Sequence, residues 1–296
     1  MSEKITVFTP TYNRANILGQ LYQSLLRQTN KDFCWLIVDD GSTDETKKII
    51  EHWINENRIK IKYFYQKNSG KMAAHNLGVE RTETELFVCV DSDDFLVDNA
   101  IDLLVNAWEN EHCDITIGII ARKGSKDGKP MGNGKFPDEK ICKMNSFMGK
   151  TFSGDTTICF ETSKLKQYKF PVIEGEKFIT ESYLYDQIDY DGHEYILLNQ
   201  VVTICEYRQD GYTLNMDVIS YRNPIGRMYN EAQNLQFADS IVDKLKACVR
   251  YNIYKNISHH SDIRMFSNSE RLLMAVTAFP GYILYKKKKN RVSKYL

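Results

Sequence analysis

Short apolar segments alternate with longer amphipathic segments along the first 121 residues of the chain. The short segments have the length of β-strands, and the longer ones repeat apolar positions at the helical spacing of three or four residues. Strands are expected at 5–8, 34–38, 59–65, 86–90 and 115–121, and helices at 15–28, 45–56, 72–80 and 100–109. This strand-then-helix order predicts an α/β fold with a Rossmann-like, mainly parallel sheet and helices on both of its faces.

The rest of the chain is less regular. Residues 122–150 are rich in glycine and lysine, which indicates an exposed hairpin or a mobile loop. Further strands are expected at 156–160, 195–198 and 201–207, and further helices at 181–188, 224–254 and 269–278. We therefore expect one domain over residues 1–215 and a helical extension over residues 216–296 that ends in a basic tail.

Length and composition fit this organisation. A chain of 296 residues with 42% hydrophobic and 26% charged residues is typical of a folded protein with a large domain and an appendage. Its longest nearly apolar stretch, residues 275–285, is shorter than the ~20 residues that span a bilayer. The N-terminus shows no secretory signal, and the seven cysteines have no zinc-ligand spacing. We therefore expect a cytoplasmic protein with free thiols.

A cluster of acids follows the fourth expected strand. The run FVCVDSDDF places Asp91, Asp93 and Asp94 at the carboxyl end of the sheet, where ligands of such folds bind. Carboxylates this close repel each other, and a divalent cation relieves the repulsion. Because carboxylates are hard oxygen ligands, Mg²⁺ or Mn²⁺ is favoured over zinc. The alternative is that these acids only form a turn and cap the next helix.

Two more polar loops lie at the same edge. Asp39 and Asp40 end the second strand in WLIVDDGSTDET, where a carboxylate could accept a hydrogen bond from a nucleobase. In KNSGKMAAHNLG, Gly70 opens a turn and Lys71 offers a point charge suited to phosphate. The sequence contains neither a GxGxxG motif nor a P-loop, so the two commonest nucleotide-binding motifs are excluded.

These runs carry a family resemblance. TVFTPTYNRANIL, DDGSTD, NSGKMAAHNLG and VDSDDF occur in this order over residues 4–96. In this region the chain resembles the nucleotide-sugar-binding half of family 2 glycosyltransferases of the GT-A fold. The resemblance implies that residues 1–96 bind a nucleoside-diphosphate sugar and that residues 97–215 face the acceptor. It also implies a divalent metal, Mn²⁺ or Mg²⁺, that bridges the diphosphate to the protein.

The resemblance further implies a role for individual residues. It places Pro10, Tyr12 and Arg14 in the nucleotide loop, and it places Asp40 at the base and Lys71 near the nucleotide. It also places Asp93 at the ribose or the metal, and Asp94 or Asp91 at the metal.

Inverting members of the family commonly carry a Glu-Asp pair at the start of a helix in the second half. The corresponding segment here, GEKFITESYLYDQI, has Glu181 followed by Ser182, so the second acid is missing. Glu181 is the candidate base that deprotonates the acceptor hydroxyl, and Asp186, one helical turn later, is its rival. Glu174 and Glu176 in the preceding loop are further alternatives. Glu181 could also be a solvated acid at a helix start.

The C-terminal sequence suggests a membrane contact. The apolar residues of YILYKKKKNRVSKYL precede six basic residues within 286–296, a segment without acidic residues. This arrangement suits an anionic membrane surface, where each nearby Lys or Arg contributes about 1 kcal/mol. A solubilising tail is the alternative. Nucleic acid is not expected as a partner, because the remaining chain offers no basic groove.

We thus expect an inverting, metal-dependent glycosyltransferase that moves a sugar from a UDP-linked donor to a hydroxyl of a glycan or lipid-linked acceptor. It would serve cell-surface polysaccharide synthesis as a peripheral protein at the inner face of the cell membrane. Arg208, in YRQDGYTLN, is suited to closing over the diphosphate or the acceptor. Two alternatives stay open, namely a nucleotidyltransferase that attacks the α-phosphate and a catalytically silent nucleotide-sugar-binding subunit.

Overall fold

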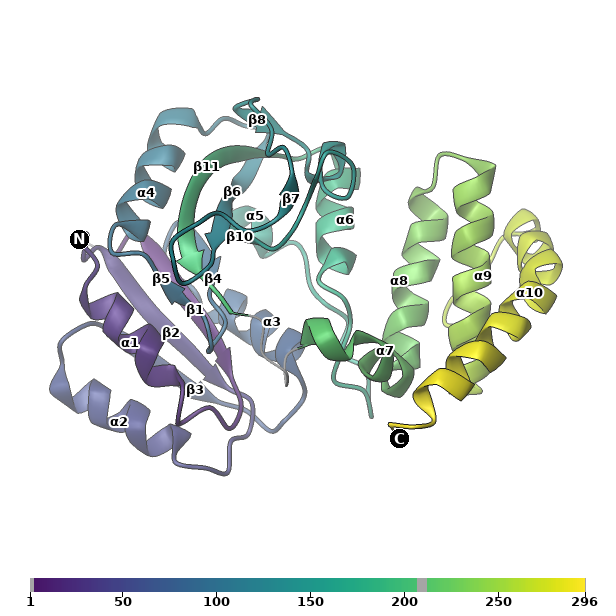
Figure 1. Cartoon of the computed structure of the whole chain (residues 1–296), viewed down its shortest axis with the longest axis horizontal. Helices are drawn as coiled ribbons and strands as arrows, with labels where there is room; N and C mark the ends of the chain where they lie inside the picture. The colour runs from purple at the N-terminus through teal and green to yellow at the C-terminus, as the bar shows by residue number, and fades with distance from the viewer. Residues whose placement is uncertain (1–2, 207–211, 296) are drawn as a thin grey trace. The chain divides into compact units, whose positions relative to one another are not determined.

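The computed structural model describes residues 3–206 and 212–295. The chain divides into two compact units, one of Met1–Lys169 with Tyr185–Glu206 and the other of Phe170–Leu184 with Tyr207–Leu296. We call them the sheet unit and the helical unit, after their main elements (Figure 1). The boundary differs from the expected one at residue 215, and the segment 170–184 belongs to the helical unit. Arg208 lies outside the described residues.

Nine of the described strands form one mixed sheet in the sheet unit. They are β1 (Ile5–Thr11), β2 (Phe33–Asp39), β3 (Ile61–Tyr65), β4 (Leu86–Cys89), β5 (Phe95–Leu96), β6 (Thr116–Gly124), β8 (Ile141–Cys142), β10 (Thr156–Glu161) and β11 (Glu194–Ile204). Their order is β3-β2-β1-β4-β10-β6-β11-β5, and β8 pairs with β11. The strands β3, β2, β1 and β4 run parallel, which confirms the expected α/β fold and brings their carboxyl ends to one edge.

Helices cover both faces of this sheet (Figure 1). The sheet unit contains α1 (Leu18–Leu26), α2 (Thr46–Glu56), α3 (Lys71–Arg81), α4 (Ala100–Glu111) and α5 (Thr162–Leu165), and α6 (Ser182–Tyr190) crosses from one unit to the other. On one face, Ile5 and Val7 of β1 join the core formed with α1, α2 and α4. On the other face, Phe8 packs so closely against α3 that a Cβ at Gly78 would lie 2.4 Å from its ring. The alternation of side chains along β1 therefore supplies both layers.

The segment 122–150 is held by aromatic packing. Its short strand β7 (Asn133–Gly134) pairs with β9 (Phe152–Ser153), and a 3₁₀ turn covers Met144–Ser146. Phe136, Phe147 and Phe152 are buried together, and the Arg122 guanidinium lies 5.3 Å and 5.1 Å from the rings of Phe136 and Phe152. Of the two expectations for this segment, the hairpin describes it better than the mobile loop.

The helical unit contains α7 (Tyr212–Arg222), α8 (Pro224–Phe237), α9 (Ile241–Ser258) and α10 (Asn268–Val292). The single helix expected over 224–254 is thus two helices, whose apolar faces form a separate core around Met228, Cys248 and Tyr251. The helix expected over 269–278 continues to Val292 without a break at Pro280. Gly281 permits the close crossing of α9 and α10, because a Cβ there would lie 2.7 Å from the Cβ of Asn252.

Candidate active site

The loops after β1 and β2 are joined by Asn13. Its backbone has the left-handed conformation, with φ of 52°. The Asn13 N–H donates to Oγ of Ser42 at 2.8 Å, and its Oδ1 accepts from the N–H of Thr43 at 2.8 Å. Because Thr11 and Asp39 also pair at the ends of the two strands, both loops start from a common edge and are bonded to each other.

Asp39 is a structural acid. It is fully buried, and it accepts hydrogen bonds from the Ser42 N–H at 2.7 Å and from the Tyr63 hydroxyl at 2.8 Å. Burial and this hydrogen bond raise the pKa of Tyr63. Both oxygens of Asp39 thus serve the fold, so of the adjacent pair Asp40 is the better candidate for a ligand.

Asp40 holds the loop between β3 and α3. Its Oδ1 accepts from Gln66 Nε2 at 2.7 Å and from the Ser69 N–H at 2.8 Å, and its Oδ2 accepts from the Gly70 N–H at 2.8 Å. Gly70 has a φ of 94°, which favours glycine at this turn. A carboxylate has about four acceptor positions, so three donors leave one of them, on Oδ2, for a ligand.

Lys71 begins α3 and reaches the acidic loop after β4. Its Nζ lies 2.8 Å from Oδ1 and 3.1 Å from Oδ2 of Asp91, which is partly exposed. Burial would raise the pKa of Asp91, but the positive charges of Lys71, Lys123 and Arg14 outweigh it and hold that pKa below its usual value. Asp91 is therefore ionised and already paired with a cation of the chain.

Asp94 is paired with a lysine from β6. Its Oδ2 lies 2.7 Å from Nζ of Lys123, and both side chains are largely buried. Burial raises the pKa of Asp94 to about 6, with Lys123 opposing the shift and the neighbouring Asp91 and Asp93 adding to it. The Asp94 N–H also donates to the Asp91 carbonyl at 3.0 Å. Asp94 and Lys123 thus anchor the end of the acidic turn.

Asp93 lies inside this turn. No residue in the described part of the chain forms a hydrogen bond or ion pair with its partly exposed carboxylate. Nor do three or more His, Cys, Asp or Glu side chains converge on a metal position within residues 3–206 and 212–295. Mg²⁺ is usually held by one or two carboxylates together with substrate phosphates. Asp93 and Asp91 fit such a site. The arrangement does not fit a metal held by three carboxylates of the chain.

The three residues expected in the nucleotide loop differ in accessibility. Pro10 is buried in β1 opposite Val38, so it shapes the strand end. Tyr12 is 47% exposed and presents its ring beside the loops. The backbone N–H of Arg14 donates to Oγ1 of Thr46 at 3.1 Å, and the charge of Arg14 acts on Asp91.

The candidate bases lie at the start of α6. Glu181 is exposed and directly precedes the helix, and Asp186 is partly buried within it. Glu181 belongs to the helical unit and Asp186 to the sheet unit. Asp189, further along α6, is buried and accepts hydrogen bonds from the backbone N–H groups of residues 144 and 145.

Glu176 has a structural role. Its two oxygens each accept a hydrogen bond at 2.7 Å, from the N–H groups of Ile225 and Gly226 at the start of α8. Burial raises the pKa of Glu176, and these two hydrogen bonds oppose the shift. An acid at a helix N-terminus stabilises the helix. Glu176 is thus committed to α8, and of the loop acids only the exposed Glu174 stays a rival of Glu181 and Asp186.

Three side chains that form hydrogen bonds or ion pairs with Asp39, Asp40 and Asp94 were not among the residues predicted from the sequence. They are Tyr63 with Asp39, Gln66 with Asp40, and Lys123 with Asp94. Gln66 directly follows β3 and Lys123 lies next to the end of β6, so their positions at strand ends were a usable signal.

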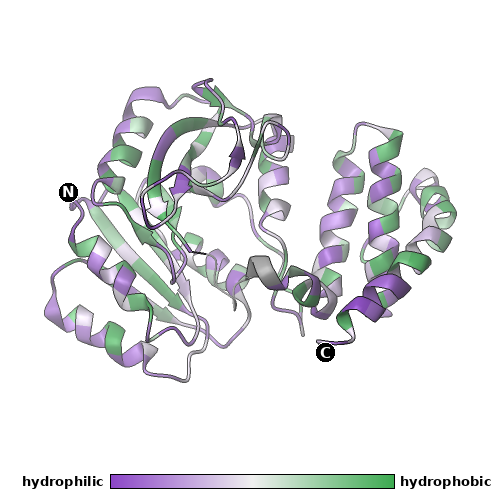
Figure 2. Cartoon of the chain, viewed as in Figure 1, coloured by the Kyte–Doolittle hydropathy of each residue, from purple (hydrophilic) through white to green (hydrophobic). Residues whose placement is uncertain are grey.

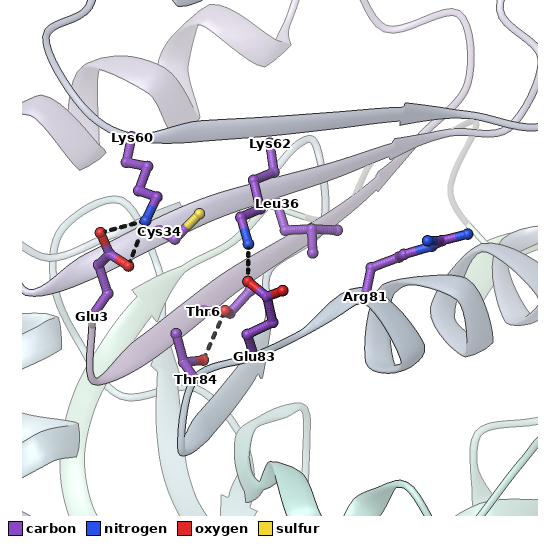
Figure 3. A pocket seen from close by; sticks show the side chains of 9 residues that line it. All are labelled: Glu3, Thr6, Cys34, Leu36, Lys60, Lys62, Arg81, Glu83 and Thr84. Carbon is purple, nitrogen blue, oxygen red and sulfur yellow. Dashed lines mark hydrogen bonds and ion pairs between the residues drawn. The ribbon is translucent and has the colours of Figure 1, made fainter. Parts of the chain in front are cut away.

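A pocket of about 110 Å³ lies at the opposite, amino ends of β1, β2 and β3 (Figure 3). Four of its five charged side chains form ion pairs, Lys60 with Glu3 at 2.8 Å and Lys62 with Glu83 at 2.5 Å, and the guanidinium of Arg81 lies 5.4 Å from the ring centre of Phe64. This pocket is distant from the acidic loops, and its ion pairs explain its lining without a ligand.

The loops with Tyr12, Asp40, Lys71 and Asp93 lie at the edge where a parallel sheet binds ligands. The family of the chain follows from a comparison of its sequence with family models. The sequence model of the family described as Glycosyl transferase family 2 matches residues 6–174, more than half of the chain. The chain belongs to this family. This confirms the resemblance found in the sequence and makes the chain a glycosyltransferase of the GT-A fold.

Two relatives illustrate the range of this glycosyltransferase family. GalNAc(5)-diNAcBac-PP-undecaprenol beta-1,3-glucosyltransferase of Campylobacter jejuni is 26% identical over 266 residues, which cover 88% of this chain and 83% of the relative. Glycosyltransferase GlyG of Streptococcus pneumoniae is 33% identical over 130 residues, which cover 43% of this chain and 42% of GlyG. The first similarity therefore extends into the helical unit.

Solved structures share the glycosyltransferase fold. S. aureus TarS 1–349 in complex with UDP-GlcNAc superposes with a TM-score of 0.61 at 17% identity, over 97% of this chain and 92% of that one. The mannosyltransferase PcManGT of Pyrobaculum calidifontis, with GDP-Man and Mn²⁺, gives a TM-score of 0.56 at 16% identity, over 97% and 84%. At these identities the likeness concerns the fold alone.

Proposed function

We propose that this glycosyltransferase transfers a sugar from a UDP-linked donor to a hydroxyl of a lipid-linked or polysaccharide acceptor, with inversion at the anomeric carbon. The observation that carries the proposal is that an ion pair connects the start of α3, after the β3 loop, with the acidic loop after β4. Asp40 fixes the loop before α3, Lys71 of that helix pairs with Asp91, and the carboxylate of Asp93 is left without a partner in the described chain.

The donor would bind across the carboxyl ends of β1, β2 and β3. The exposed ring of Tyr12 suits stacking on a base, and the remaining acceptor position of Asp40 suits a base N–H. Lys71 would turn from Asp91 toward the diphosphate. A uridine nucleotide is the choice because the fold neighbour TarS was solved with UDP and with UDP-GlcNAc.

Asp93 and Asp91 would hold a divalent metal together with the diphosphate. When bound, Mn²⁺ or Mg²⁺ supplies positive charge that stabilises the departing diphosphate. Manganese is present with PcManGT and with GalNAc-T7, two proteins of similar fold. Asp94, which the sequence offered as a metal ligand, would instead position the turn through its ion pair with Lys123.

Glu181 would take the proton from the acceptor hydroxyl, which then attacks the anomeric carbon from the face opposite the diphosphate. Its exposed position before α6 supports this role, and two nearby acids are committed elsewhere, Glu176 to α8 and Asp189 to backbone N–H groups. Asp186 is the second candidate, because it lies within the helix that begins directly after Glu181.

The acceptor would be lipid-linked and the enzyme peripheral at the inner face of the cell membrane, in the synthesis of a cell-surface polysaccharide. The name of the Campylobacter jejuni relative supports this, since it describes transfer to an undecaprenol-linked glycan. A teichoic acid poly(glycerol phosphate) polymerase of Staphylococcus epidermidis is 33% identical over 119 residues, which cover 40% of this chain and 16% of that protein.

The test is donor turnover by the purified full chain with Mn²⁺ and a panel of nucleotide sugars. We expect one UDP-sugar to be hydrolysed slowly to UDP and free sugar, and Asp93→Asn to stop this release. Pyrophosphate release would instead indicate a nucleotidyltransferase. A chain that binds UDP-sugar without any turnover, even with lipid-linked glycan present, would be a silent binding subunit.

A further inference from the structure

The helix α10 has two unlike faces. Its inner face packs in the helical unit through Thr277, Gly281, Tyr285 and Val292, all buried. Its outer face carries four large apolar side chains, Leu272, Val276, Phe279 and Ile283, which are 66%, 65%, 73% and 40% exposed. Spacings of four, three and four residues place these four on one face of the helix. We call them the outer stripe.

Single exposed apolar side chains are common on soluble proteins, but contiguous apolar patches mark an interaction site. The outer stripe covers three turns of one helix, with the exposed ring of Tyr282 beside it. Figure 2 shows the change along α10 from hydrophobic residues in its middle to hydrophilic residues toward its C-terminal end. A partner that fits this side of α10 would be apolar opposite the outer stripe and anionic opposite the C-terminal end of the helix.

Two lysines extend the same face. Lys286 and Lys287 follow Ile283 by three and four residues, and Lys289 is also exposed. The ammonium of Lys286 lies 5.4 Å from the ring centre of Tyr282. By contrast, Lys288 and Arg291 are each paired with Asp217 of α7, and Lys288 is largely buried while Arg291 is exposed.

The outer stripe has no acid to neutralise these lysines. The one acidic residue of α10, Glu270, is bonded in the capping box with Ser267 and in an ion pair with Arg264. A second copy of this face would therefore offer apolar contact but no countercharge. An anionic lipid surface offers both, with acyl chains for the stripe and phosphate for the lysines.

We infer that α10 lies flat on an anionic membrane, with Phe279 and Ile283 at the boundary of headgroups and acyl chains and Lys286, Lys287 and Lys289 on lipid phosphates. Among the described helices, none has the length and apolar character needed to cross a bilayer. The inference deepens the proposed function, because a lipid-linked acceptor lies at such a surface, but its test does not depend on turnover.

This surface differs from the tail expected from the sequence. It begins at Leu272, nearly four helical turns before the first lysine at Lys286. Tyr285, expected at the membrane, is buried in the helical unit. The segment after Ala278 includes the buried residues Gly281 and Val292, so its removal would damage the core. Substitutions on the outer face are therefore the suitable test, and truncation is not.

The experiment is co-sedimentation of the full chain with vesicles of phosphatidylcholine alone or mixed with phosphatidylglycerol, at low and high salt. We expect binding only to the anionic vesicles and only at low salt. F279S/I283S should weaken binding at least tenfold, and K286Q/K287Q/K289Q should remove the dependence on phosphatidylglycerol. The matched control I241S/V242S alters two apolar residues at the start of α9 that are 59% and 54% exposed, and it should bind as the parent does.

Three results would overturn the inference. The first is a parent chain that ignores anionic vesicles at low salt, and the second is equal binding by F279S/I283S and the parent. The third is a parent that is dimeric in solution and becomes monomeric in F279S/I283S, which would assign the outer stripe to a second copy. UDP release is measured for every variant as well. Vesicle binding and UDP release can then fail independently, so a failure of this inference is distinguished from a failure of the proposed transfer reaction.

Discussion

Nζ of Lys71 lies 2.8 Å and 3.1 Å from the two carboxylate oxygens of Asp91, so the first residue of α3 neutralises an acid of the loop after β4. In the donor-free chain this lysine competes with a metal for Asp91. A bound diphosphate gives Lys71 another partner and releases the carboxylate. Metal and nucleotide should therefore strengthen each other's binding, and by linkage the effect is equal in both directions.

Lys71→Met tests this competition. The variant should bind Mn²⁺ several-fold more tightly than the parent when no nucleotide is present, because the competing cation is gone, and it should bind UDP at least tenfold more weakly. Electron paramagnetic resonance of free Mn²⁺ measures the first effect and calorimetry the second. Lys67→Met, at an exposed lysine of the same loop, is the control. Unchanged or weaker Mn²⁺ binding by Lys71→Met would refute the competition.

Substitutions of Asp93 and Asp94 should differ in their effect on the free energy of unfolding. Asp93→Asn should leave the free energy of unfolding within about 0.5 kcal/mol of the parent, because no described residue bonds to this carboxylate. It should abolish Mn²⁺-dependent UDP binding. Asp94→Asn should lower the free energy of unfolding by about 3 kcal/mol, since it leaves the charge of Lys123 largely buried and unpaired.

A double variant separates the pair from general damage. Adding Lys123→Met to Asp94→Asn removes the orphaned charge and should recover part of the lost stability. Urea unfolding of the parent, Asp94→Asn, Lys123→Met and the double variant measures the coupling energy between the two side chains. If Asp93→Asn proves as destabilising as Asp94→Asn, our division of the acids into a ligand and an anchor is wrong.

Asp40→Asn should loosen the loop before α3. The amide nitrogen of asparagine would face donors at Ser69 or Gly70, so at least one buried hydrogen bond is lost, at a cost of about 1–3 kcal/mol. UDP affinity should fall more than tenfold, since Lys71 begins the helix that this loop positions. Gln66→Ala removes one donor only and should have a smaller effect on both quantities.

Glu181→Gln preserves shape but cannot accept a proton, so the transfer rate should fall by about 10² to 10⁴ with UDP-sugar affinity little changed. Asp186→Asn is the parallel variant. Glu176→Gln should lower stability by about 1 kcal/mol through the N-terminus of α8 and leave the transfer rate close to that of the parent. Full activity in Glu181→Gln together with an inactive Asp186→Asn would transfer the role of base to Asp186.

The pair of Asp217 with Lys288 gives the helical unit a pH dependence. The hydrogen bond from Lys288 lowers the pKa of Asp217, burial opposes it, and the charges of Lys288 and Arg291 lower it further. A lowered pKa means that the stabilisation is complete above the usual value of 3.8 and is lost as the pH falls through the folded-state pKa.

Asp217→Asn should therefore lower the free energy of unfolding by about 0.5–1 kcal/mol at neutral pH, the range of an exposed ion pair. The difference from the parent should shrink as the pH falls below 3.8 and vanish once the carboxylate is protonated in both states. Thermal unfolding across this pH range measures it. A constant difference at all pH values would show that the loss comes from packing and not from charge.

The sequence by itself determined the sheet that carries the site. The apolar segments at 5–8, 34–38 and 86–90 lie within or overlap β1, β2 and β4, because a short run of mainly apolar residues is visible in the local sequence. The acids after β2 and β4 could be found for the same reason, since they follow these strands directly, and Lys71 could be found because it begins the helix after β3. The order of four motifs then indicated the family.

Tertiary structure decided which of these side chains are available. Asp94 meets Lys123 and Asp40 meets Gly70 across about 30 positions of sequence, and Glu176 meets Gly226 across 50. The same holds for α10, where only packing against α9 shows that Tyr285 is buried while Phe279 and Ile283 face outward. Local patterns predict where a side chain starts, but its partners are set by chain segments that meet only when the protein folds.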